Sequence, residues 1–200
     1  MTYDFLTETY ATERMKVLGV WSEFHDADLP VRPRDGDPRG RSVHEQMVHQ
    51  CVSEDLWFRT MLDIDIGAVP LPAQETRMEF IKLYAEHSGV RLASLKEKNA
   101  AWWEDSAKFF DVQRSRAWIM TRRLTHTAHH RGQQMAMLRM LGRDLHSNYG
   151  PTADTGGLMQ NHAPTIYAYP TLSALLEESP KAKLPGPGDK PPTERPTPSS

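Results

Sequence analysis

The sequence contains little that marks a secreted or membrane-bound protein. Its single cysteine, Cys51, excludes an internal disulfide, which fits a reducing compartment. Residues 1–6 lack the positively charged start of a secretory signal peptide. No uninterrupted apolar run approaches the roughly 20 residues that cross a bilayer. We therefore expect a protein of the cytoplasm without a membrane segment.

Neither sign of charge is in clear excess. The chain has 24 Lys and Arg against 26 Asp and Glu, a formal net charge of −2 and a pI near 6.5. This balance gives no overall attraction to nucleic acid or to an anionic membrane. Arginines are frequent between residues 114 and 143, but neighbouring acids compensate them and no DNA-reading motif accompanies them. The composition favours small molecules, or a second copy of the chain, as partners.

Strand-like alternation is also absent, whereas apolar residues at helical spacing are common. Residues 3–25 form one amphipathic pattern. Two further helices are predicted to begin at capping boxes, in which a hydroxyl side chain and a glutamate three residues later satisfy free backbone N–H groups. These pairs are Ser42 with Glu45 and Thr76 with Glu79, and the helices should run to about residues 62 and 99.

A fourth helix is predicted over residues 112–141, which contain no proline and end before Gly142. An aromatic-rich connector, "WWEDSAKFFD", precedes it, and proline-rich loops separate the other helices. Four helices of similar length with modest connectors predict an all-α protein, a four-helix bundle over residues 1–145.

The C-terminal part has a different composition. Residues 146–179 read as an irregular extension that packs on the bundle, with a short helix within "TLSALLEES". From Pro180 onward, proline is frequent and only Ala182 and Leu184 are apolar. No core can offset the entropy of ordering such a chain, so residues 180–200 are predicted to be a disordered tail.

Histidines are concentrated in the fourth predicted helix, within "RLTHTAHHRGQQ". His126 and His130 are four residues apart and therefore share one helix face, which allows both imidazoles to bind one ion, whereas His129 points elsewhere. His49 is the best candidate for a third ligand, because it shares a stripe with Val52 and Leu56 in the second helix. The alternatives are a solvated histidine pair or buried histidines satisfied by hydrogen bonds.

Several other sites can be set aside. The histidines of "HEQMVH" are five apart, and His44 is expected to be exposed, so this is no zincin motif. None of the nine histidines follows a glutamate by three residues, as a di-iron bundle requires. Cys51 is expected to be a small buried side chain rather than a nucleophile.

Three segments together resemble the DinB-like family of four-helix-bundle metalloproteins. They are "SVHEQMVHQCVSEDLW", "THTAHHRGQQMAMLRMLG" and "NYGPTADTGG", and the likeness covers residues 3–157. In that family one histidine of the second helix and two of an H-x-x-x-H-R-G-Q motif bind a divalent ion. The resemblance assigns these roles to His49, His126 and His130, and zinc or nickel are the ions that we expect.

The resemblance also implies an activity. The family includes transferases and isomerases that use low-molecular-weight thiols such as bacillithiol or mycothiol, so a thiol activated by the ion would attack a small electrophile. Gln133 is a candidate for binding that ligand, and Arg131 either attracts an anionic substrate or lies in water. Gly132 is interpreted as a point of close helix approach. A homodimer is expected by resemblance, and the alternative function is a metal-binding stress-response protein without turnover.

Overall fold

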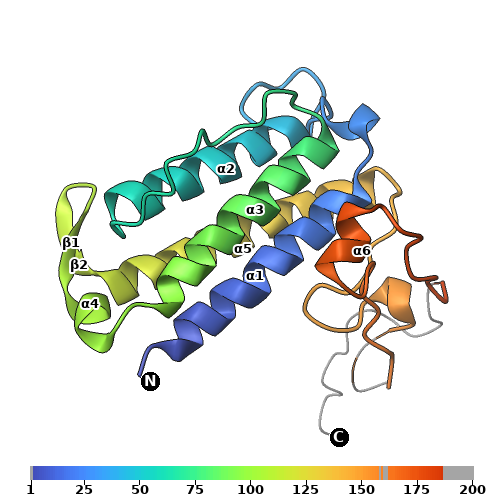
Figure 1. Ribbon diagram of the computed structural model, residues 1–200. Helices are drawn as coiled ribbons and strands as arrows, with labels where there is room; N and C mark the ends of the chain where they lie inside the picture. The colour runs from blue at the N-terminus through green and yellow to red at the C-terminus, as the bar shows by residue number, and fades with distance from the viewer. Residues whose placement is uncertain (1, 158, 160–161, 187–200) are drawn as a thin grey trace, which may run out of the picture.

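The computed structural model describes residues 2–157, 159 and 162–186, and it is mainly helical (Figure 1). Four long helices form a bundle: α1 (Asp4–Glu23), α2 (Val43–Thr60), α3 (Arg77–Lys96) and α5 (Arg116–Met140). α1 packs against α3 and α5, and α2 packs against the same two helices. The bundle therefore closes into a ring in the order α1, α3, α2, α5. The predicted all-α fold is confirmed.

Short elements lie between the long helices or after the last of them. They are the 3₁₀ turn η1 (Asp26–Asp28), α4 (Ala100–Glu104), the strands β1 (Ser106–Phe109) and β2 (Val112–Ser115) and, after the last long helix, the 3₁₀ turn η2 (Ala153–Thr155) and α6 (Leu172–Leu176). The short helix predicted within "TLSALLEES" is α6. Among the described residues, no helix is long and apolar enough to span a membrane.

The helix starts follow the predicted capping chemistry. Ser42 and Glu45 make both bonds of the capping box: the Ser42 hydroxyl accepts the Glu45 N–H, and the Glu45 carboxylate accepts the Ser42 N–H. At α3, the Thr76 hydroxyl accepts the Glu79 N–H as expected. The Glu79 carboxylate instead pairs with Lys82 at 2.8 Å, one turn further along the helix.

The prediction of a fourth helix from residue 112 is wrong at its start. Residues 112–115 form β2, which pairs antiparallel with β1 so that Phe109 faces Val112 across the two-residue turn 110–111. The helix begins only at Arg116, where the Ser115 hydroxyl accepts the Trp118 N–H. Phe110 has a positive φ of 53° in the turn, where glycine, asparagine or aspartate is usual. The sequence therefore carries no ordinary hairpin signal.

The interior consists of two apolar clusters. One includes Val17, Met47, Ile81 and Met137 with their neighbours, and the other includes Leu6, Phe58, Leu95 and Met120 with theirs. On each long helix, buried polar or charged residues lie between the two clusters or at the edge of one of them. They include Glu13 and Arg14 on α1, Glu54 and Asp55 on α2, Ser88 and Arg91 on α3, and Arg123, Thr127 and Arg131 on α5.

Glu54 is the central acid of this polar layer and is 0% exposed. Its oxygens accept hydrogen bonds from the hydroxyl groups of Tyr10 at 2.7 Å and Tyr84 at 3.0 Å. The guanidinium groups of Arg91 and Arg123 lie 3.7 and 3.5 Å from its oxygens. Burial and the Glu54 charge raise the pKa of both tyrosines, so the hydroxyls stay protonated and donate. One carboxylate thus contacts all the other long helices.

The C-terminal extension packs against α1. The buried His146 places Nδ1 2.7 Å from Glu23 and Nε2 2.7 Å from the Ala182 carbonyl oxygen, and Lys181 reaches Glu23 at 2.9 Å. Burial alone lowers the pKa of His146, but the bonds to Glu23 and Ala182 raise it overall. Lys181 and Ala182 fall within the predicted disordered tail, yet Lys181 contacts Glu23 of the bundle and Ala182 contacts His146 of the extension. Residues 187–200 of that tail lie outside the described residues.

We predict that Glu54→Gln lowers the free energy of unfolding by about 3–5 kcal/mol, because it leaves two buried guanidinium groups with too little negative charge. Urea denaturation of the two proteins would measure the difference. Lys82→Met, which removes an exposed ion pair, should change stability by less than about 1 kcal/mol. A small effect of Glu54→Gln would show that the polar layer contributes little to the fold.

Candidate metal centre

Two neighbouring helices bring three histidines together. His49 lies on α2, and His126 and His130 lie one turn apart on α5. One ring nitrogen from each forms a set in which all members lie within 4.8 Å of one another. His49 is thus close to the other two although far from them in sequence, with ring centroids 5.3 Å from His126 and 4.6 Å from His130.

The spacing of the donor atoms allows them to bind one and the same ion. The Nε2 atoms of His126 and His130 are 3.3 Å apart. Two nitrogens that each bind zinc at about 2.0–2.1 Å in tetrahedral geometry are separated by roughly 3.3 Å. The donor set therefore fits a divalent metal ion, and it contains no carboxylate or thiolate among the described residues.

The imidazoles are held in the neutral form that binds metals. Burial lowers the pKa of His126 to about 3, with a further contribution from the positive charge of Arg123. Burial and the neighbouring His49 lower the pKa of His130 to about 4, and burial also lowers the pKa of His49. Each ring consequently offers a lone pair at neutral pH without first losing a proton.

Besides the contact between His126 and His130, aromatic packing orients these rings. The Nδ1 atoms of His126 and His130 are buried and have no hydrogen-bond partner among the described residues. The indole of Trp57 stacks on His126 at 5.6 Å with an interplanar angle of 27°. The rings of Phe109 and Phe110 in turn meet Trp57 edge to face at 5.2 and 6.3 Å. An aromatic wall thus borders the cluster on the side of the β-hairpin.

The sequence did not reveal this aromatic wall or the charge of Arg123 beside it. Phe109 and Phe110 lie at the end of a hairpin that was not predicted, and Phe110 is 60% exposed. Arg123, three residues before His126, is fully buried beside Glu54, with its guanidinium 5.6 Å from the Trp57 ring centroid. The spacing of Arg123 from His126 was visible, but its burial depends on the packing of four helices.

The other histidines of these helices lie outside the cluster. His129 is exposed, and its Nε2 pairs with the side chain of Gln133 at 2.9 Å. His44 is partly exposed and pairs with Glu75. Gln133, the candidate ligand-binding residue, is therefore exposed and lies beside His129 rather than within the cluster. Gln134 faces inward instead and accepts the indole N–H of Trp21 at 3.2 Å.

Two interpretations of neighbouring residues are wrong. Arg131 neither lies in water nor is free for an anionic substrate, since it is fully buried and paired with Glu13. Gly132 does not permit a close helix approach, because an added Cβ would have nothing within 4 Å. Cys51 is buried and free, and burial raises its thiol pKa, which agrees with a structural role.

The fold and the cluster define a class of protein: a four-helix bundle with a three-histidine centre suited to a divalent ion. The chain belongs to the DinB family, since residues 3–156 match the DinB family profile.

Solved structures of DinB-like proteins share the fold. One from Bacillus cereus ATCC 10987 is similar with a TM-score of 0.64 and 14% identity, over 72% of this chain and 95% of that one. Another, from Bacillus subtilis, has a TM-score of 0.55 and 11% identity, over 70% and 94% of the two chains. No curated protein matches the sequence.

We predict that His49→Ala, His126→Ala and His130→Ala each weaken metal binding by more than about 100-fold, because each removes a direct ligand rather than a hydrogen-bond partner of one. Elemental analysis and calorimetric titration with zinc or nickel would measure this. His129→Ala is the matched control and should retain the affinity. Equal effects of His129→Ala and His130→Ala would contradict the assigned ligand set.

The lowered histidine pKa values predict a pH dependence for the metal-free protein. The unfolded chain binds protons at these histidines near pH 6.5, whereas the folded chain binds them only near pH 3–4. Stability should therefore fall as the pH decreases from about 6.5 towards 4. Urea denaturation across this range should show a shallower loss for the His126→Gln, His130→Gln double variant, and an identical slope would contradict the neutral, buried state of these rings.

Proposed function

We propose that this protein is a metal-dependent enzyme that transfers a low-molecular-weight thiol to a small electrophile. His49, His126 and His130 would hold the divalent ion, zinc or nickel. The observation that carries this proposal is the convergence of three neutral imidazoles from two helices, with no acidic ligand among the residues that the structure describes. Such a donor set leaves the double charge of the ion uncompensated, and three protein ligands leave at least one coordination position.

The ion, when bound at such a site, lowers the pKa of a thiol or a water molecule. The chain supports this chemistry through charge. Arg123 is near enough to His126 to lower its pKa, so the same positive charge favours an anionic nucleophile beside the cluster. Glu54 faces Arg123 from the interior of the bundle and offsets part of this charge, but among the described residues no acidic side chain belongs to the donor set itself.

The aromatic wall would receive the apolar part of the electrophile. Trp57 contacts both His126 and the hairpin aromatics, so a molecule resting on Phe110 and Trp57 would lie next to the ligands. Phe110 combines a positive φ with high exposure, and such strain at a non-glycine residue is frequent at functional sites. Gln133 would reach the bound ligand by exchanging its bond to His129.

We further propose that the enzyme acts as a homodimer in the reducing cytoplasm, where low-molecular-weight thiols are kept reduced. Val52 and Leu56 on α2, 39% and 40% exposed, follow His49 along the helix and offer apolar surface to a second copy.

The test is consumption of a thiol with a panel of small electrophiles by the metal-loaded protein. We expect activity that disappears on chelation, is restored by zinc or nickel, and falls at least about 100-fold in His130→Ala but not in His129→Ala. Full metal occupancy without turnover for any electrophile would refute the enzyme proposal and favour a metal-binding stress-response protein.

A further inference from the structure

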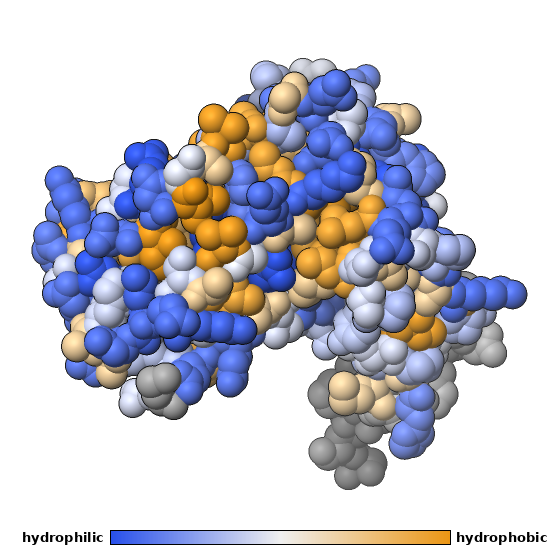
Figure 2. Space-filling model, viewed as in Figure 1, coloured by the Kyte–Doolittle hydropathy of each residue, from blue (hydrophilic) through white to orange (hydrophobic). Residues whose placement is uncertain are grey.

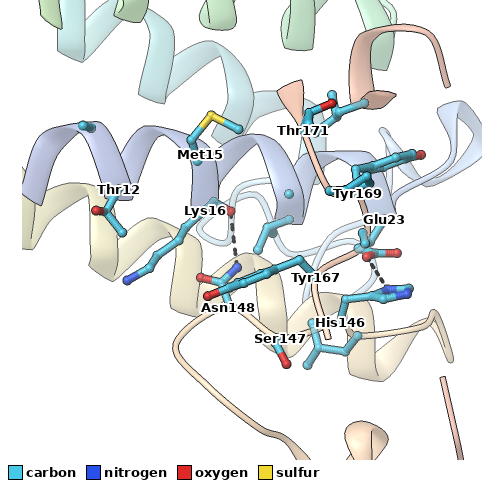
Figure 3. Close-up of a pocket in the computed structure, with 17 residues that line it drawn as sticks. Thr12, Met15, Lys16, Glu23, His146, Ser147, Asn148, Tyr167, Tyr169 and Thr171 are labelled. Atoms are coloured by element: carbon cyan, nitrogen blue, oxygen red, sulfur yellow. Dashed lines mark hydrogen bonds and ion pairs between the residues drawn. The ribbon is translucent and has the colours of Figure 1, made fainter. Parts of the chain in front are cut away.

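A cavity of about 420 Å³ lies between α1 and the C-terminal extension, and none of its lining residues belongs to the three-histidine cluster (Figure 3). α1 contributes one face at helical spacing, including Met15, Lys16, Gly19 and Glu23. Residues 145–148 and 167–171 close the opposite side, together with Leu175 of α6. Its volume falls within the range of about 300–1,000 Å³ typical of small-molecule sites.

Gly19 is the unusual residue of this cavity. It lies inside α1, where glycine destabilises a helix relative to alanine. Neither a positive φ nor a close contact requires it, because a Cβ built at Gly19 has nothing within 4 Å. The missing side chain instead leaves open space beside the lining residues. Glycine at this position therefore lowers the stability of α1, and the effect seen in the structure is a larger cavity.

The walls are mainly apolar and aromatic. Met15, Val20 and Leu145 contribute aliphatic or thioether surface, and Tyr167 and Tyr169 contribute rings. Tyr167 is 58% exposed. On the outer surface, hydrophobic residues gather where α6 and the C-terminal segment meet α1 (Figure 2). A ligand seated against these walls would gain hydrophobic contact and would cover an exposed aromatic ring.

One polar atom of the lining lacks a partner. Asn148 is only 4% exposed, and its Nδ2 donates to the Lys16 carbonyl oxygen at 3.3 Å. Its Oδ1 is buried without a hydrogen-bond partner among the described residues. Figure 3 shows the Asn148 amide between the α1 backbone and Tyr167. Since an unsatisfied buried acceptor is costly, a ligand that donates an N–H or O–H here would remove the penalty.

The charged groups of the lining are already paired. Glu23 faces His146 on one oxygen and Lys181 on the other. The Lys16 ammonium pairs with Glu13 at 3.0 Å and lies 3.7 Å from the Tyr149 ring centroid. Neither a free cation nor a free carboxylate among these groups awaits a charged ligand, so the cavity favours an uncharged one.

We propose that this cavity is a second binding site, separate from the metal centre, for a small uncharged molecule with an apolar ring body and one hydrogen-bond donor. The body packs between the face of α1 at Gly19 and the rings of Tyr167 and Tyr169. The donor bonds to Asn148 Oδ1.

Indole and 1-methylindole are matched probes, because the second lacks the N–H donor. Titration of the full-length protein with each probe, monitored by ligand-observed NMR, should show that indole binds at least about fivefold more tightly than 1-methylindole. Gly19→Leu fills the open space and should weaken indole binding at least about tenfold. Gly19→Ala is the control, and its small methyl group should change the affinity less than threefold.

Asn148→Ala leaves α1 intact and should abolish the preference for indole while retaining 1-methylindole binding. Zinc binding should be unchanged in all three variants, which checks that they fold and separates this site from the metal centre. Absence of indole binding by the wild type, unchanged binding by Gly19→Leu, or equal binding of the two indoles would each overturn the proposal.

Discussion

The buried carboxylate of Glu54 is the interaction on which the arrangement of the four long helices depends. It accepts hydrogen bonds from tyrosine hydroxyl groups of α1 and α3 and faces guanidinium groups of α3 and α5. A buried charge is tolerated only when opposite charges and hydrogen-bond donors surround it. Sliding any one helix along its axis would separate Glu54 from some of these partners. The polar layer thus restricts the helices to one register, which apolar packing alone specifies less strictly.

This register also determines the geometry of the histidine cluster. Ser53, next to Glu54, accepts a hydrogen bond from Arg123 at 3.0 Å, and Arg123 lies one turn before His126. Trp57, three residues after Glu54, contacts both the Arg123 guanidinium and the His126 ring. The same short segments of α2 and α5 therefore carry the structural ion pair and the candidate ligands. A displacement of α2 against α5 would disturb both.

His49 joins the cluster although the helix face that it shares with its apolar neighbours is not buried. The sequence indicates His49 as a third ligand because it shares a stripe with two apolar residues, Val52 and Leu56. Both of these residues are substantially exposed, whereas His49 contacts the rings of His126 and His130 on α5. The stripe and the family resemblance both indicated His49, which does lie beside His126 and His130, but the exposure of Val52 and Leu56 shows that the stripe is not a buried face. Arg131 shows the opposite error, because a charged residue in a polar motif proved to be fully buried with Glu13.

The local features follow from the sequence alone. Capping at Ser42, the helical spacing of apolar residues and the shared face of His126 and His130 depend on residues within one or two turns of each other. Contacts between side chains of different elements depend on how the helices pack: Glu54 meets two arginines, His49 meets the α5 pair, and Gly19 borders the cavity beside the extension. The physical reason is that helix periodicity acts through the local backbone, whereas helix register and the path of residues 106–115 follow from the burial of side chains distant in sequence.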